Sequence, residues 1–209
     1  MKRVLLFGLV VVGVAVLFYF GWFLRNPERQ VPQDPGMFVS PANGRVAAVV
    51  HWNADSLSWR KDLGVVQVMT GEVDTAGWLV AIEMNVMNVH YQRAPMAARL
   101  IGSLYTEGRF NNALVRTNRF GLRLENERND MLFETDAGLR FKVVQVAGLL
   151  ARRIVGFLSP GQSVAVGETI GVIRMGSQVA LVLPSGTEPL VKEGDYVIDG
   201  ESWLARVLP

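Results

Sequence analysis

The chain has few residues whose side chains could carry out chemistry. Its 209 residues include no cysteine and two histidines, His51 and His90. The absence of cysteine excludes disulfides, cysteine-ligated zinc, iron–sulfur clusters and a thiol nucleophile. Two histidines are too few to indicate a histidine-rich metal site, so we expect no bound metal. His90 is the candidate acid or base, because imidazole titrates near neutral pH, whereas His51 lies in no motif and is interpreted as structural.

The sequence also lacks the usual motifs for an organic cofactor. It has no phosphate-binding loop, no dinucleotide-binding glycine pattern and no H-E-x-x-H motif. A pyridoxal enzyme would need a lysine that forms a Schiff base with its cofactor, and none of the four lysines lies in such a motif. The net charge of +2 is too small to indicate binding to nucleic acid, and we expect no such partner.

A long apolar segment near the N-terminus predicts a membrane anchor. Val4–Leu24 contains no charged residue and, as a helix, is long enough to span the ~30 Å hydrocarbon core of a bilayer. Tyr19 and Trp22 lie near its end, where aromatic rings favour the membrane interface. A cleaved signal peptide would have a shorter apolar region that ends in small residues, so a retained anchor is favoured.

Basic residues flank both ends of this segment, so the charge pattern does not decide its orientation. Lys2 and Arg3 precede it, and Arg25 and Arg29 follow it. We expect a cell-membrane protein with a single N-terminal anchor and with its folded domain in the cytoplasm.

The remainder of the chain indicates a mainly β, β-rich α+β fold. We expect a compact domain of short antiparallel strands and hairpins with few short helices, preceded by one N-terminal transmembrane helix. Short runs rich in valine and leucine, separated by glycine, proline, asparagine and aspartate, predict the strands. These runs are Arg45–Val50, Gly64–Met69, Trp78–Ile82 and Val179–Leu183.

Three further stretches give local predictions. Leu139–Val143 alternates apolar and basic residues, which is typical of a half-buried strand. Val146–Ile154 is compatible with a short helix, although its length does not decide between helix and strand. Two Gly-Asp or Asp-Gly pairs surround Tyr196–Ile198 and predict a compact hairpin.

Four segments, taken together, resemble a known family. They are Arg25–Val46 (RNPER, VP, VSPANGRV), Met84–Pro95 (MNVMNVHYQRAP), Asn126–Asn129 with Val143–Val155 (NERN, VVQVAGLLARRIV), and Gly167–Pro184 (GETIGVIRMGSQVALVLP). Each segment alone is weak evidence, but their order and spacing are similar to those of the phosphatidylserine decarboxylases, especially their short, membrane-anchored microbial form. The resemblance covers nearly the whole chain.

The resemblance implies a proenzyme that makes its own cofactor, a pyruvoyl group, from a serine. The matching pair is Gly176–Ser177. The Ser177 hydroxyl would attack the Gly176 carbonyl, and elimination would then cut the chain and leave the pyruvoyl group at Ser177. Glycine suits the first position because a residue without Cβ tolerates strained backbone geometry. In the family the pyruvoyl group forms a Schiff base with the substrate amine and accepts electrons as CO2 leaves.

The resemblance also assigns roles to three other residues. His90 is expected to be the acid or base of self-cleavage and decarboxylation. Arg93 stands where some members have a second histidine, so either His90 serves both steps or Arg93 binds the phosphate or carboxylate of the substrate. Asn43 replaces the family's usual aspartate, which orients the histidine. An amide can orient an imidazole by hydrogen bonding but cannot stabilise imidazolium by charge.

Asn43 leaves several interpretations open. The enzyme matures slowly without the aspartate, or the chain is a non-maturing, catalytically silent relative. Deamidation of Asn43, which would create the aspartate, is a third route. The pair Asn43–Gly44 is also a strong hairpin-turn signal without any catalytic role. A membrane-anchored carrier or adaptor is less favoured, because the predicted C-terminal hairpin lacks the exposed turn lysine that a carrier needs.

From the resemblance we expect decarboxylation of phosphatidylserine to phosphatidylethanolamine in phospholipid biosynthesis, or of another serine lipid such as archaetidylserine. The expected partners are the phospholipid substrate, the membrane, the large and small chains of the same precursor, and a second copy in a homodimer. The expected domains are an anchor at residues 1–25, a linker at 26–36 and a decarboxylase domain at 37–209, cleaved between Gly176 and Ser177.

Overall fold

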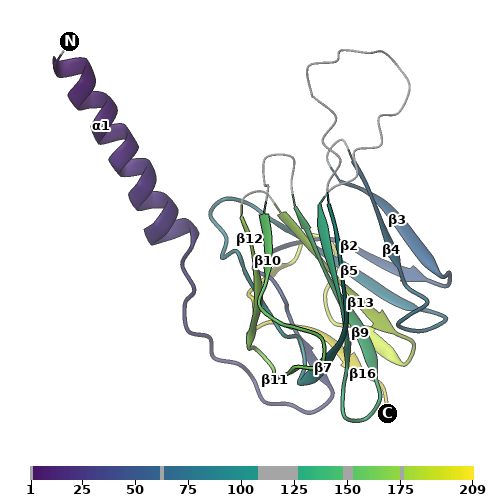
Figure 1. The fold of residues 1–209 in the computed structure, drawn as a ribbon. Helices are drawn as coiled ribbons and strands as arrows, with labels where there is room; N and C mark the ends of the chain where they lie inside the picture. Colours follow the sequence, from purple (N-terminus) through teal and green to yellow (C-terminus); the bar gives the residue numbers. More distant parts are fainter. Residues whose placement is uncertain (1, 62–63, 108–126, 148–152, 175–176) are drawn as a thin grey trace, which may run out of the picture.

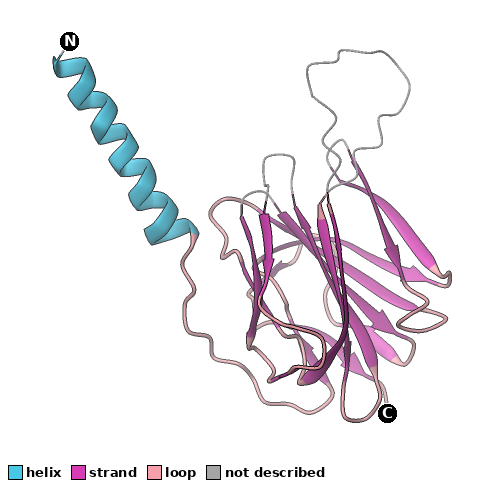
Figure 2. Ribbon diagram, viewed as in Figure 1, coloured by secondary structure: helices cyan, strands magenta, loops and turns pink. Residues whose placement is uncertain are grey.

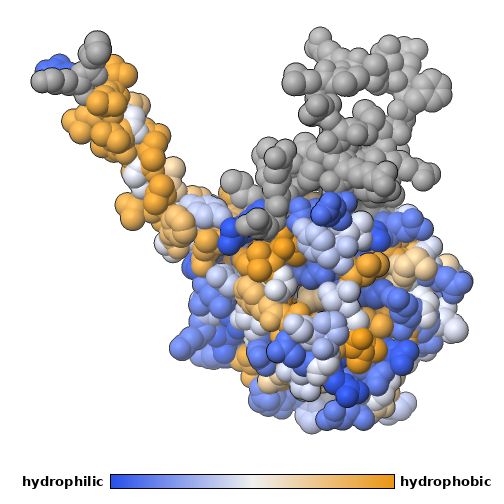
Figure 3. Space-filling view, viewed as in Figure 1, coloured by the Kyte–Doolittle hydropathy of each residue, from blue (hydrophilic) through white to orange (hydrophobic). Residues whose placement is uncertain are grey.

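An apolar helix stands clear of a body made of strands (Figure 1). The computed structural model describes residues 2–61, 64–107, 127–147, 153–174 and 177–209. The helix consists of α1 (Lys2–Leu17) and a π-helical turn, η1 (Phe18–Phe23). The stretch Arg3–Phe23 is long and apolar enough to cross a membrane, and its hydrophobic surface projects away from the body (Figure 3). The helix therefore has the length and composition that the predicted anchor requires.

The described part of the body contains strands and loops, and the prediction of a mainly β fold behind one N-terminal helix is confirmed (Figure 2). In chain order the strands are β1 (Met37–Val39), β2 (Gly44–Trp52), β3 (Ser56–Lys61), β4 (Gly64–Met69), β5 (Gly77–Met84), β6 (Tyr91–Arg93), β7 (Ala98–Thr106), β8 (Arg128–Glu134), β9 (Arg140–Ala147), β10 (Arg153–Gly156), β11 (Ser163–Val164), β12 (Thr169–Arg174), β13 (Ser177–Pro184), β14 (Thr187–Pro189), β15 (Tyr196–Val197) and β16 (Trp203–Val207).

The strands form one large sheet and three small ones. The large sheet has eight strands in the order β11-β7-β8-β9-β13-β5-β2-β15. The three small sheets are β10-β12-β6, β1-β16-β14 and the hairpin β3-β4. The pairs in all four sheets are antiparallel, as the sequence predicts.

The hydrophobic core occupies both faces of the large sheet. Along β13, Val179 and Leu181 belong to one cluster, and Ala180 and Val182 belong to the other. The first cluster includes residues of β1, β12 and β16, and the second includes residues of the β3–β4 hairpin. Because β13 is covered on both faces, its sequence is a continuous apolar run rather than an alternating pattern.

Coverage of both faces also corrects one sequence prediction. The alternation in Leu139–Val143 predicts a half-buried β9 whose basic residues face water, but Lys142 is only 2% exposed. Its ammonium group donates to the Met69 carbonyl at the end of β4 and pairs with Glu72. A buried lysine needs such partners, because an unpaired charge in the interior is costly. The prediction was wrong because the alternation carries no information about the hairpin that covers the second face.

The predictions for two other stretches were also wrong where the structure describes them. The stretch considered as a short helix, Val146–Ile154, begins within β9 and ends within β10, and residues 148–152 lie outside the described part. β10 is extended because its backbone pairs with β12 along its whole length. The predicted hairpin at Tyr196–Ile198 is not one, since β15 pairs with β2. Gly194 and Gly200 have positive φ angles of 92° and 73°, and they make the turns on either side of β15.

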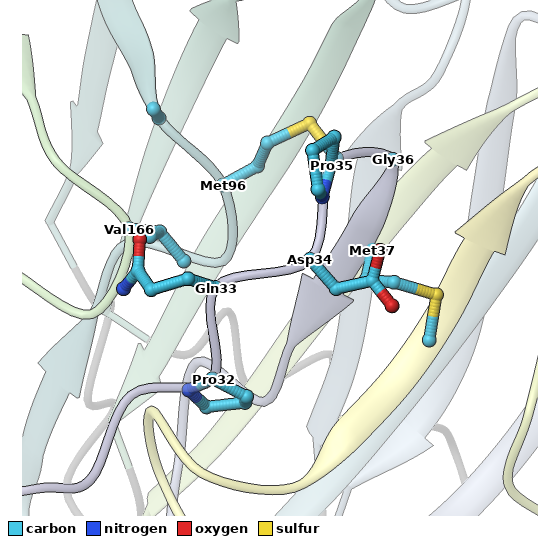
Figure 4. Close-up of a pocket in the computed structure, with 9 residues that line it drawn as sticks. Pro32, Gln33, Asp34, Pro35, Gly36, Met37, Met96 and Val166 are labelled. Atoms are coloured by element: carbon cyan, nitrogen blue, oxygen red, sulfur yellow. The ribbon is translucent and has the colours of Figure 1, made fainter.

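The segment at residues 26–36, predicted as a linker, contains no helix or strand and runs along the body (Figure 1). Arg29 forms an ion pair with the buried Asp199. Val31 packs so closely on Gly167 that a Cβ there would lie 2.3 Å from a valine methyl group. The far end of the segment lines a pocket of about 230 Å³ (Figure 4). These contacts hold the end of the anchor in a fixed position against the body.

Candidate active site

The connection after β5 carries His90 into the interior at one end of the large sheet. β5 ends at Met84 and β6 begins at Tyr91. The His90 side chain is fully buried, and its Nδ1 lies 2.9 Å from the carbonyl oxygen of Asn88. A carbonyl oxygen only accepts hydrogen bonds, so Nδ1 carries the proton and Nε2 carries the lone pair.

The Nε2 atom of His90 is buried and has no hydrogen-bond partner among the described residues. Buried polar atoms are nearly always paired, so an unpaired one calls for an explanation. A nitrogen with a free lone pair, held in a fixed tautomer, is the arrangement that a general base requires.

The end of the membrane helix covers the imidazole. The ring centroids of Phe23 and His90 are 4.0 Å apart, and the two planes are inclined by 32°. Phe23 is 2% exposed, and Tyr19 stacks on it with a centroid distance of 5.5 Å. Two aromatic rings of the anchor therefore separate His90 from bulk water.

This cover changes the protonation of His90. Burial lowers its pKa from 6.5 to about 4, because the charged imidazolium loses its hydration. The hydrogen bond to the Asn88 carbonyl opposes the shift, and the positive charge of Arg25 adds slightly to it. At neutral pH the imidazole is therefore uncharged and able to accept a proton.

Asn43 holds the loop that carries His90. Its Oδ1 accepts hydrogen bonds from Asn88 Nδ2 (3.0 Å), from the Val89 backbone N–H (3.2 Å) and from the Tyr196 hydroxyl (3.1 Å). Its Nδ2 donates to the Val197 carbonyl at 3.5 Å. Within the described residues Asn43 makes no hydrogen bond to the His90 ring, so it orients the ring indirectly, through the Asn88 carbonyl.

The alternative interpretation of Asn43–Gly44 as a hairpin turn was wrong. β1 and β2, on either side of it, pair with β16 and with β5 and β15, respectively. Gly44 is needed because a Cβ there would lie 2.2 Å from the Glu83 carbonyl oxygen on β5. The glycine thus allows close packing, and the asparagine supports the His90 loop.

Ser177 begins the strand that lies next to β5. Its backbone is paired with Met84 on one side and with Ala147 on the other. Ser177 and the His90 loop therefore lie at the same end of the large sheet. Gly176 and the Ser177 side chain lie outside what the structure describes.

A chain of side-chain hydrogen bonds that was not predicted from the sequence leads from Ser103 through three buried amides to the backbone of His90. Ser103 donates to Asn129, Asn129 to Gln145, Gln145 to Gln92, and Gln92 to the His90 carbonyl oxygen, with distances of 2.6–3.0 Å. Gln92 and Gln145 are fully buried. The signal in the sequence is the presence of amides within apolar strand segments, because a buried amide must find a partner.

Arg93 is buried, with 8% of its surface exposed. Its Nε donates to Asp199, its Nη1 to the Gly167 carbonyl and to Thr169, and its Nη2 to the side chain of Asn26 and the carbonyl of Pro27. Arginine has five N–H groups, and five acceptors surround this one. Binding of a substrate anion at Arg93 stays a prediction, and the observed contacts favour a structural role that ties the linker to the body.

The other histidine lies elsewhere. His51 is exposed on β2 and meets the edge of Trp78, near the end of β5 opposite to Met84. Across the part of the chain that the structure describes, no group of three or more histidine, aspartate or glutamate side chains is arranged to hold a metal ion.

Comparisons with known proteins place these residues in a family context. The phosphatidylserine decarboxylase family model matches residues 17–205. The chain is 38% identical over 198 residues to the phosphatidylserine decarboxylase proenzyme of Ruegeria pomeroyi, which covers 95% of this chain and 82% of the relative. It is 39% identical over 188 residues to the phosphatidylserine decarboxylase proenzyme of Erythrobacter litoralis, which covers 88% of this chain and 72% of that relative.

Proposed function

Because the chain belongs to the phosphatidylserine decarboxylase family, and is therefore a decarboxylase, we propose that it matures by cutting itself between Gly176 and Ser177. The mature enzyme then converts phosphatidylserine into phosphatidylethanolamine and CO2. The observation that carries this proposal is the His90 imidazole, which is neutral, buried and unpaired at Nε2 among the described residues. It belongs to the loop at the sheet end where β13 begins with Ser177.

Self-cleavage uses only groups of the chain and one water molecule. The Ser177 oxygen attacks the Gly176 carbonyl carbon, the peptide C–N bond breaks, and an ester replaces the amide. Removal of the Ser177 α-proton then expels the Gly176 carboxylate and leaves a dehydroalanine. Its enamine tautomerises to an imine, water replaces the nitrogen, and ammonia departs. The products are a large chain that ends at Gly176 and a small chain that begins with a pyruvoyl group.

In this proposal His90 takes the proton in the first step. A serine hydroxyl is a weak nucleophile unless a positioned base accepts its proton. The fixed tautomer places a lone pair on Nε2, and the low pKa keeps that lone pair free at neutral pH. The amide chain from Ser103 to Gln92 and the contacts of Asn43 hold the backbone on both sides of the ring.

We propose that the pyruvoyl group forms at position 177, at the end of the sheet where the His90 loop lies. When formed, the group supplies a carbonyl that accepts the electron pair released as CO2 leaves the substrate. His90 Nε2, which has no hydrogen-bond partner among the described residues, can take a proton from the substrate ammonium as the amine binds and give it to the substrate carbon after that loss. Phe23 and Tyr19 exclude water from the imidazole, which strengthens electrostatic interactions in the site.

The contacts of the anchor support its retention in the mature protein. Phe23 covers His90, and Asn26 accepts a hydrogen bond from Arg93. Removal of these residues with a signal peptide would expose the imidazole and remove one of the five acceptors around the buried Arg93 guanidinium. We place the protein in the cell membrane on this basis, and the cytoplasmic location of the body stays a prediction.

Asn43 is the reason to consider the alternative that the chain is a catalytically silent relative, because an asparagine supplies no charge. Its Oδ1 nevertheless accepts the hydrogen bonds that support the His90 loop, and a carboxylate oxygen of aspartate would accept the same bonds. This intact support favours a chain that matures.

The proposal is tested with purified full-length protein and defined lipids in mixed micelles. The wild type, Ser177→Ala and the matched control Ser159→Ala, which changes an exposed serine, are each given phosphatidylserine or archaetidylserine. Mass spectrometry measures the decarboxylated lipid. We expect product from the wild type and the control, and none from Ser177→Ala, which has no oxygen to attack or eliminate. Product from Ser177→Ala would refute the cofactor assignment, and product from archaetidylserine alone would refute the substrate.

A further inference from the structure

An arginine joins the end of the anchor to the tip of the His90 loop. Arg25 Nη2 donates to the Met87 carbonyl at 2.6 Å, and Nη1 donates to the Trp22 carbonyl at 2.8 Å. The guanidinium also lies over the Trp22 ring, 4.3 Å from its centroid. One rigid, planar group therefore bridges the helix end and the loop.

These contacts fix the height of the loop relative to a bilayer. The segment that can cross a membrane ends at Phe23, and Trp22 is of the type that favours the interface. Arg25 follows two residues later, and its side chain contacts the Met87 carbonyl directly. The tip of the loop is thus at the level where the anchor leaves the hydrocarbon core.

The tip presents two neighbouring apolar side chains to the outside. Val86 is 49% exposed and Met87 is 53% exposed. Hydrogen bonds within the loop fix its conformation, since Asn85 Oδ1 accepts from the Met87 N–H (2.9 Å) and Asn88 Oδ1 accepts from the Asn85 N–H (2.7 Å). Asn88 is buried, and the exposed Asn85 bonds to the backbone of the tip, so the tip carries two exposed apolar side chains on a hydrogen-bonded loop.

We propose that the Val86–Met87 tip inserts into the surface of the phospholipid bilayer beside the anchor. The bilayer is the occupant that the structure favours, because the tip is continuous with the membrane-spanning helix through Arg25. Apolar side chains at the boundary of headgroups and acyl chains gain by leaving water. If the proposed function holds, the insertion also brings the serine headgroup of a lipid toward His90, three residues after Met87.

The absence of cysteine from the chain gives a direct test. Met87→Cys is labelled with an environment-sensitive fluorophore in full-length Ser177→Ala protein, reconstituted in phosphatidylcholine–phosphatidylglycerol vesicles. The matched control is Leu208→Cys, at an apolar position with 44% exposure. The Leu208 backbone N–H donates to the carbonyl of Gly186, which follows the end of β13. That end lies about 23 Å from Ser177, at ~3.3 Å per residue along the strand.

Nitroxide groups attached to the acyl chains near the headgroups quench only those fluorophores that lie at the bilayer surface. We expect the label at position 87 to lose most of its fluorescence in vesicles that contain these lipids, and the label at position 208 to lose almost none. Equal quenching at the two positions would overturn the proposal. Arg25→Gln should reduce the quenching at position 87, and unchanged quenching would show that Arg25 does not hold the tip. Neither result depends on maturation or decarboxylation, so the failure of this inference is distinguishable from the failure of the proposed function.

Discussion

The Phe23 ring should set the proton affinity of His90. Burial lowers the pKa of His90 from 6.5 to about 4. At ~1.4 kcal/mol per pH unit, this difference favours the neutral imidazole by about 3 kcal/mol. Phe23 lies directly against the ring, so Phe23→Ala should admit water to one face. We expect the pKa of His90 to rise by about one unit or more toward its ordinary value, because imidazolium regains hydration.

Nuclear magnetic resonance measures this pKa directly. The protein is labelled with ¹⁵N-histidine and titrated in detergent micelles, in a His51→Gln, Ser177→Ala background that leaves one imidazole and an uncut chain. Phe7→Ala is the matched control, because Phe7 belongs to the same helix but is 71% exposed. An identical His90 pKa in Phe23→Ala and Phe7→Ala would refute the claim that the anchor desolvates the imidazole.

The same shift has a consequence for stability. His90 binds a proton more weakly in the folded state than in the unfolded state, where its pKa is near 6.5. Folding stability should therefore decrease as the pH falls from about 6.5 to about 4, by up to ~3 kcal/mol from this group. Chemical denaturation of the wild type and of His90→Gln, each at pH 7 and pH 4.5, isolates the contribution of His90 to the free energy of unfolding. An equal loss of stability in the two proteins would contradict the prediction.

Substitutions at His90, Asn43 and Gln145 test the remaining parts of the site. His90→Gln should slow self-cleavage by about 10²–10⁴-fold, as loss of a general base does, and a gel time course after synthesis would detect normal cleavage if His90 were only structural. Asn43→Ala removes the acceptor of two buried N–H donors, at a cost of about 1–3 kcal/mol, and should slow cleavage, whereas Asn43→Asp keeps an acceptor and should not; equal rates would mean that the acceptor does not matter. Gln145→Leu breaks the amide chain and should lower the melting temperature, whereas Gln67→Leu, on the exposed side of β4, should not; equal melting temperatures would contradict a stabilising role for the chain.

The strands and the anchor were largely predictable from the sequence. Continuous apolar runs mark β5 and β13, because these strands are covered on both faces. Local patterns failed where a distant element decides the outcome. Lys142 has the spacing of an exposed residue, and only the packing of the β3–β4 hairpin buries it. The pairing of β15 with β2, rather than with a neighbour in sequence, likewise depends on the whole topology.

The candidate site was predictable in its reactive groups but not in its environment. His90 and Ser177 stand in motifs, so the family resemblance is enough to identify them. Phe23 is one aromatic residue in a long apolar run, and nothing in the sequence distinguishes the ring that covers His90. Tyr196 is separated from Asn43 by most of the chain, and their contact follows from the pairing of β15 with β2.

The most direct test of the central claim is the intact mass of the full-length protein purified from its native host. Self-cleavage predicts two chains, one of residues 1–176 and one of residues 177–209. The small chain should be lighter by one ammonia than the same peptide beginning with serine, which separates pyruvoyl formation from simple proteolysis. A single uncut chain, or a small chain that begins with an intact serine, would contradict the account.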